Sequence, residues 1–102
     1  MVTIGSGGVI YLNAFIMRNY YKGINWVVLL HDKIAHSLAI KPCLKEEEGA
    51  FRLNFSSLES KSTGVIAARS VIKYLKIDYS KTKQFVSSWN AKERMLEIKL
   101  DK

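Results

Sequence analysis

The sequence has a single cysteine, Cys43, and no long hydrophobic run. One cysteine excludes an intramolecular disulfide, and without a second one the chain lacks the spacing of a zinc or redox motif. We therefore expect a reducing compartment, the cytoplasm. The longest uninterrupted apolar run, Trp26 to Leu30, is far shorter than the roughly 20 residues of a membrane-spanning helix. Because no basic region precedes the first apolar stretch, the sequence predicts neither a membrane span nor a signal peptide.

A recognisable catalytic or metal-binding pattern is also missing. The glycine-rich stretch Gly5 to Gly8 lacks the Lys-Ser/Thr pair of a phosphate-binding loop and precedes a predicted strand, not a helix. His31 and His36 flank Asp32, which is too small a local set of ligands for a divalent metal. The run Glu46 to Glu48 is typical of a solvated loop. We therefore expect no enzyme activity, no catalytic residue, no metal and no cofactor.

The length and the charge of the chain limit its number of domains and the partners that it can attract. The 102 residues suffice for one compact domain with a modest core, and a hydrophobic fraction of 48% is ordinary for a globular protein. The net charge is +7, of which residues 1–49 contribute +1 and residues 50–102 contribute +6. A basic second half can attract nucleic acid, acidic proteins or a lipid surface, and charge alone does not choose among them.

Two similar phrases stand 56 residues apart: GVIYLNAFI from Gly8 to Ile16 and GVIAARSVI from Gly64 to Ile72. A second match, Leu38 to Lys41 with Leu96 to Lys99, follows in the same order at an offset of 58 residues. Two matches in nearly constant register indicate an internal duplication.

Hydrophobic periodicity predicts the same five elements in each half. In the first half we expect a helix from Ala14 to Tyr21, capped by Asn13 and ended by Gly23, and strands at 2–4, 9–12, 26–30 and 37–41. In the second half we expect a helix at 68–76 and strands at 51–54, 65–67, 85–89 and 95–100.

These elements predict an α+β fold made of two duplicated β-β-α-β-β motifs. The single domain, 1–102, would contain a first motif at 1–43, a linker at 44–49 and a second motif at 50–102. A motif of about 50 residues buries little surface alone, so we expect the two motifs to share one core around a pseudo-twofold axis. Their seam would form a groove.

The stretch from Ile4 to Pro42 resembles the swapped-hairpin domain of AbrB-like and MazE-like regulators. The resemblance is carried by Gly8, Ile10, Leu12, Ile16 and the ending Leu38-Ala39-Ile40-Lys41-Pro42. The chain departs from that pattern at Asn13, where proline is usual, and at Met17, where arginine is usual. In size and layout the whole chain also resembles small orphan proteins of filamentous viruses that infect hyperthermophilic archaea. That second resemblance implies a location in the host cytoplasm and no assigned activity.

We favour slightly a protein-interaction module that binds a peptide or protein segment in the groove between the motifs. Aromatic side chains provide large contact areas, although for any one of them packing in the core is the commoner role. The candidates for the groove are Tyr20, Tyr21, Trp26, Tyr74, Tyr79 and Trp89.

The alternative is an AbrB-like nucleic-acid-binding protein that uses a basic face of the second motif. Spacing places three of the candidates on one helical face, and the other two follow in the next loop: Arg69, Lys73, Lys76, Lys81 and Lys83. An ordinary solvated face explains these charges nearly as well, since the first half has only Arg18 and Lys22 in the corresponding region. We expect a monomer or weak homodimer with a protein partner or, in the alternative, nucleic acid, and no membrane.

Overall fold

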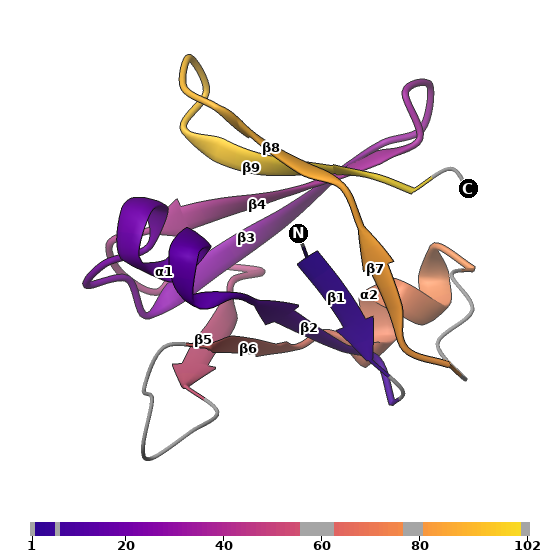
Figure 1. Ribbon diagram of the computed structural model, residues 1–102, viewed down its shortest axis with the longest axis horizontal. Coiled ribbons are helices and arrows are strands. Elements are labelled where there is room, and N and C mark those ends of the chain that lie inside the picture. The colour runs from indigo at the N-terminus through magenta and orange to yellow at the C-terminus, as the bar shows by residue number, and fades with distance from the viewer. Residues whose placement is uncertain (1, 6, 56–62, 77–80, 101–102) are drawn as a thin grey trace.

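The computed structural model describes residues 2–5, 7–55, 63–76 and 81–100. They form nine short strands and two short helices (Figure 1). The helices are α1 (Ala14–Tyr20) and α2 (Arg69–Tyr74). The strands are β1 (Val2–Gly5), β2 (Val9–Leu12), β3 (Trp26–Asp32), β4 (Ser37–Cys43), β5 (Phe51–Phe55), β6 (Gly64–Ala67), β7 (Lys83–Phe85), β8 (Ser87–Asn90) and β9 (Met95–Lys99).

The strands form one antiparallel sheet in the order β7-β1-β2-β6-β5-β3-β4-β9-β8. The two ends of this order, β7 and β8, are separated along the chain only by Val86. The sheet also changes direction at β5. Phe51 and Arg52 pair with β3, whereas the rest of β5 pairs with β6. The sheet therefore curves into a nearly closed barrel (Figure 1).

The predicted α+β fold of two duplicated β-β-α-β-β motifs around a pseudo-twofold axis is wrong. The protein is mostly β, and pairs of strands from residues 1–43 alternate with pairs of strands from residues 50–102 around a single sheet. β1 pairs with β7, β2 with β6, β3 with β5, and β4 with β9. Short strands need a partner for their backbone N–H and C=O groups, and here much of that partnership comes from the other half of the chain.

The positions of single elements were predicted more accurately than their arrangement. The helix expected from Ala14 to Tyr21 forms as α1, and the expected strand 9–12 forms as β2. The expected strand 85–89 is split, since β7 ends at Phe85 and β8 begins at Ser87. The helix expected at 68–76 is shorter, because α2 ends at Tyr74 and Lys76 has a left-handed backbone with φ of 60°.

The two pairs of similar phrases lie side by side in the sheet. β2 and β6 pair with Ile10 opposite Ile66, and β4 and β9 pair with Leu38 opposite Ile98. All four of these side chains are buried. The similarity thus places matching alternations of inward and outward residues on neighbouring strands.

In strands such as β2 and β9, every second residue fills the inside of the barrel. In β2, Ile10 and Leu12 are buried while Val9 and Tyr11 are half-buried. The same alternation in β9 buries Leu96 and its second neighbour Ile98. Successive side chains of a strand point to opposite faces, so this period of two creates one apolar interior.

The helices add a few side chains to this core. Ile16 and Met17 of α1 and Ile72 of α2 are buried. The Asn13 side chain accepts a hydrogen bond from the Ile16 N–H at 2.9 Å, which confirms the predicted N-cap of α1. The two helices lie on opposite sides of the barrel in Figure 1.

Candidate functional site

Three of the six aromatic groove candidates come together where α1 meets β8. The rings of Tyr20 and Trp89 are stacked, with centroids 4.3 Å apart and planes 12° apart. Tyr21 contacts the same indole edge-on, with centroids 6.1 Å apart and planes 79° apart. These contacts join α1 to the sheet, and Tyr21 is fully buried, so its ring packs in the core and does not line a surface.

The Tyr21 hydroxyl also reaches the pairing of β4 with β9. It donates a hydrogen bond to the Ile40 backbone carbonyl, and Ile40 lies opposite Leu96 in the sheet. Burial raises the pKa of the Tyr21 hydroxyl above its ordinary value, and a backbone hydrogen bond with Leu96 acts in the opposite direction. The hydroxyl is therefore neutral at physiological pH and serves as a structural link.

The remaining aromatic candidates belong to other places. Trp26 of β3 is half-buried, and the Arg52 guanidinium carbon lies 5.6 Å from the centroid of its ring. Tyr74 of α2 is 76% exposed. Tyr79 lies outside the described residues. The six aromatics therefore do not form one surface in the described part of the chain.

Paired strands occupy the seam where the groove was expected. β2 and β6 are paired over four residues each, and so are β4 and β9. Because these ladders join residues 1–43 directly to residues 50–102, the described strands leave no groove between the halves there.

All five basic candidates are exposed and come from α2 and the region of β7. Arg69 and Lys73 lie on α2, and Lys76 follows it. Lys81 lies two residues before β7, and Lys83 is the first residue of that strand. We call these five residues the α2–β7 surface.

The turn between β1 and β2 brings the two parts of this surface together. Gly8 has a φ of 81°, and a Cβ there would lie 2.6 Å from the Arg69 Cα, so α2 begins directly on this turn. The Ala68 N–H also donates to the Gly8 carbonyl at 3.1 Å. On the other side of β1, Lys83 lies opposite Ile4. Accordingly, α2 and β7 lie on the same side of the barrel in Figure 1.

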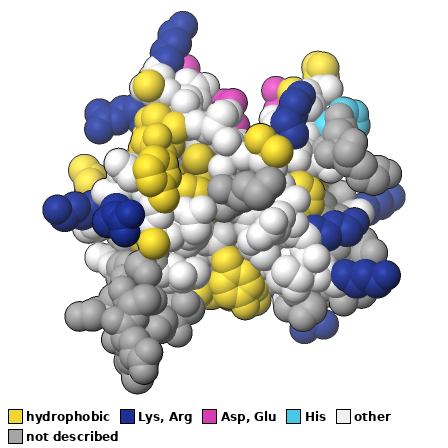
Figure 2. All heavy atoms as spheres, viewed as in Figure 1, with side chains coloured by type: hydrophobic (Ala, Val, Ile, Leu, Met, Phe, Trp, Pro, Cys, Tyr) yellow, Lys and Arg dark blue, Asp and Glu magenta, His cyan; other side chains and the backbone are white. Residues whose placement is uncertain are grey.

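The charge of the α2–β7 surface has one sign. Residues 69–76 and 81–85 contain five Lys and Arg and no Asp or Glu, while Asp78 lies in the segment 77–80 outside the described residues. Figure 2 shows several Lys and Arg side chains on this side of the molecule. Arg18 and Lys22 belong to α1 and the residues just after it, on the opposite side. Clustered cations with no Asp or Glu in the same described segments create a positive potential that attracts polyanions.

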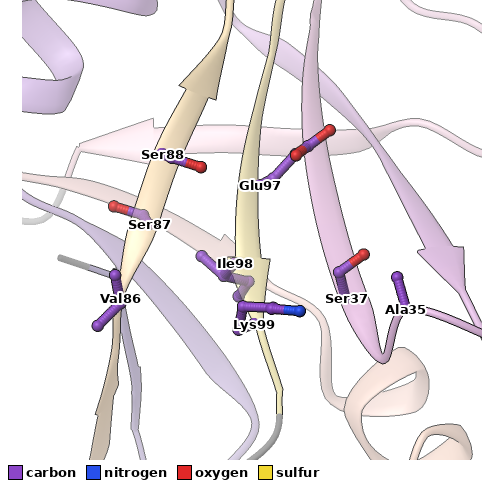
Figure 3. Close-up of a pocket in the computed structure, with 8 residues that line it drawn as sticks. All are labelled: Ala35, Ser37, Val86, Ser87, Ser88, Glu97, Ile98 and Lys99. Atoms are coloured by element: carbon purple, nitrogen blue, oxygen red, sulfur yellow. The ribbon is translucent and has the colours of Figure 1, made fainter.

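A separate hollow of about 210 Å³ lies over β8, β9 and the start of β4 (Figure 3). Ser87 and Ser88 line one side, Glu97 and Lys99 lie in the middle, and Ser37 lines the other side. Pockets for small organic ligands usually measure about 300–1,000 Å³, so this hollow is small for that role. Neither a histidine nor a cysteine is among the residues that line it, so it does not assemble a nucleophile with an imidazole base.

The histidines are positioned by a turn. His31 and His36 are exposed at the end of the β3–β4 hairpin. The Asp32 carboxylate between them accepts hydrogen bonds from the backbone N–H groups of Ile34 and Ala35, both at 3.0 Å, and so shapes the turn. Within the part of the chain that the structure describes, no group of three or more His, Cys, Asp or Glu side chains is arranged to hold a metal ion.

Cys43 is buried at the end of β4. Burial raises the pKa of its thiol, Glu47 raises it further, and Lys41 lowers it. The thiolate is the reactive form of cysteine, so a raised pKa makes this side chain a poor nucleophile at neutral pH.

Sequence reasoning missed the hollow and the pairing of Arg52 with Trp26. Both features join strands that are distant along the chain, such as β3 with β5 and β4 with β9. Local periodicity carries no signal for such contacts, because it reports the face of a strand and not the identity of its neighbour.

Among the described residues, no helix has both the length and the apolar character needed to cross a bilayer. Comparison of the chain with protein-family models, with curated proteins and with solved structures found no match.

Proposed function

We propose that this protein is a non-enzymatic nucleic-acid-binding protein and that the α2–β7 surface is its binding site. The observation that supports this most is that α2 and the region of β7, which lie next to the β1–β2 turn and to β1, carry five exposed cations, with no acidic side chain in the described parts of those segments. Lysine and arginine bind nucleic acid by neutralising phosphates and releasing condensed counterions. A net charge of +7 adds long-range attraction.

Peptide binding is the second candidate, at a different place from the expected groove. β8 pairs only with β9 among the described strands and ends the sheet order, and the adjacent Val86 is 66% exposed. A strand with one open edge can accept an extended peptide through main-chain hydrogen bonds. Saturable peptide binding that persists at moderate salt would favour this candidate, provided that the Val86→Lys variant loses that binding.

Salt dependence tests the nucleic-acid proposal. A double variant, Lys73→Gln with Lys81→Gln, removes two cations from the α2–β7 surface, and Arg18→Gln with Lys22→Gln removes two from the α1 side. We expect the first variant to reduce the slope of log affinity against log salt by about 0.7–0.9 for each lost phosphate contact. The α1 variant should leave the slope unchanged at the same net charge.

Equal losses in both double variants would show that only net charge matters and would overturn the assigned site. If the unaltered protein bound neither single-stranded nor duplex nucleic acid at low salt, the proposed function itself would be rejected.

A further inference from the structure

α2 carries an exposed aromatic ring among its cations. Ile72 points into the barrel and is fully buried, whereas Tyr74, two residues later, is 76% exposed. At 3.6 residues per turn these two positions lie on opposite faces of a helix, while Ser70, one turn before Tyr74, lies on the same face as Tyr74. The outward face of α2 is therefore centred on Ser70 and Tyr74, with Lys73 on one flank. Arg69 lies further round the helix, nearer the side of Ile72, and all four of these outer residues are exposed.

The core does not explain the position of this ring. The inward side of α2 is already occupied by Ile72, with Val71 and Leu75 packed partly buried against the same core. A tyrosine ring normally contributes by being buried, so one left on a solvated basic face has its flat surface available to a ligand. Arginine and lysine beside such a ring add binding sites for phosphates.

The geometry of α2 is poorly suited to reading duplex DNA. With six residues it is about 9 Å long at 1.5 Å per residue. Its first residue, Arg69, is packed on the β1–β2 turn at Gly8, so the N-terminal end that usually contacts base edges in the major groove is covered. Only the side of the helix is therefore accessible to a nucleic acid. In a duplex the flat faces of the bases are stacked on one another, so they are not accessible to the Tyr74 ring.

We infer that the ligand of the α2–β7 surface is single-stranded nucleic acid, with an unpaired base stacked on the Tyr74 ring. In this arrangement Lys73, on the flank of the same face, binds a phosphate next to that base, and Arg69, Lys81 and Lys83 bind phosphates further along the strand. The inference rests on the proposed function and adds the class of ligand. Stacking uses the π-face that every base has, so little sequence preference is expected.

Binding of a single-stranded oligothymidylate of about 12 nucleotides, compared with a duplex of the same length at fixed salt, tests the inference. We expect tighter binding of the single strand. Tyr74→Leu keeps an apolar side chain but removes the ring, and should weaken single-strand binding about 5- to 100-fold while changing duplex binding less than about twofold. Tyr74→Phe keeps the ring and should bind the single strand within about twofold of the unaltered protein.

Phe15→Leu is the matched control, because Phe15 is an exposed aromatic, 59% accessible, on the other helix near Arg18 and Lys22. It should leave single-strand affinity unchanged. Thermal melting of each variant checks that the fold is retained, as expected for exposed positions. Equal affinity for both ligands, or full single-strand affinity in Tyr74→Leu, would overturn the inference while leaving salt-dependent binding in place. Failure to bind either ligand would instead reject the proposed function.

Discussion

Tyr21 is the residue that links the end of α1 to β4 and β8. Its buried ring contacts Trp89, and its hydroxyl donates to the Ile40 carbonyl. We expect Tyr21→Phe to reduce the free energy of unfolding by about 1–3 kcal/mol, because the buried carbonyl loses its donor while the ring is kept. Urea unfolding measures this loss. Tyr20→Phe serves as the control, since that ring is only half-buried, and should change stability little. Equal stability of both variants would contradict the structural role of the Tyr21 hydroxyl.

The same hydroxyl makes stability depend on alkaline pH. Because burial raises the pKa of folded Tyr21 above that of the unfolded chain, its contribution is fully present below pH about 10 and is lost as the pH rises beyond that value. The free energy of unfolding should therefore fall more steeply above pH about 10 in the unaltered protein than in Tyr21→Phe. Parallel curves of unfolding free energy against pH for the two proteins would show that the Tyr21 hydroxyl does not contribute to the pH dependence of stability.

At the scale of elements, the β1–β2 turn fixes the position of α2. We expect Gly8→Ala to destabilise the protein by more than Gly7→Ala. Both glycines have a positive φ, 81° and 89°, which costs an L-residue about 1 kcal/mol, but only at Gly8 would the added Cβ meet the backbone of Arg69. Thermal melting compares the two variants. Gly8→Ala should also weaken nucleic-acid binding, because it shifts α2 and its cations. Equal melting temperatures would contradict the close packing of α2 on the turn.

Helices and strands were predictable where the local sequence carried one clear pattern, such as a capping residue or a strict alternation of apolar residues. Asn13 marked the start of α1, and alternation marked β2 and β9. The division of 85–89 into β7 and β8 was not predictable, because the break at Val86 arises where the chain changes partner from β1 to β9.

Arg69 and Lys73 lie on α2 as expected, whereas Lys76 follows the helix and Lys83 lies on β7 and not in a loop. The place of α2 beside the β1–β2 turn depends on a contact between Gly8 and Arg69 that spans 61 positions of the sequence, which local patterns do not report.

At the scale of the molecule, each half depends on the other for its sheet. Isolated residues 1–43 keep the β1–β2 and β3–β4 hairpins but lose β5, β6, β7 and β9 as neighbours. We expect this fragment to be unfolded, because two-stranded hairpins are at best marginally stable in water. Circular dichroism and amide hydrogen exchange measure this. A cooperatively folded fragment with protected amides in β1 to β4 would contradict the interleaved sheet and support two self-sufficient motifs.

The similar phrases show why the order of the strands in the sheet was harder to predict than the positions of the strands in the sequence. The similar segments 9–12 and 65–67 were each predicted to be strands, which the structure confirms, and the sequence was then divided into two units. The pairing of Ile10 with Ile66 instead places those strands next to each other. Hydrophobic pattern sets which face of a strand is buried, whereas the choice of neighbour depends on the packing of the complete chain.

The single residue between β7 and β8 makes this part of the chain sensitive to length. Val86 is 66% exposed, so exchanging its side chain should disturb little. Inserting one residue beside it would reverse which side chains of β8 face inward, turning Trp89 away from Tyr20 and Tyr21. An insertion of two residues restores the alternation. Related sequences should therefore vary freely in identity at this corner while conserving the parity of its residue count.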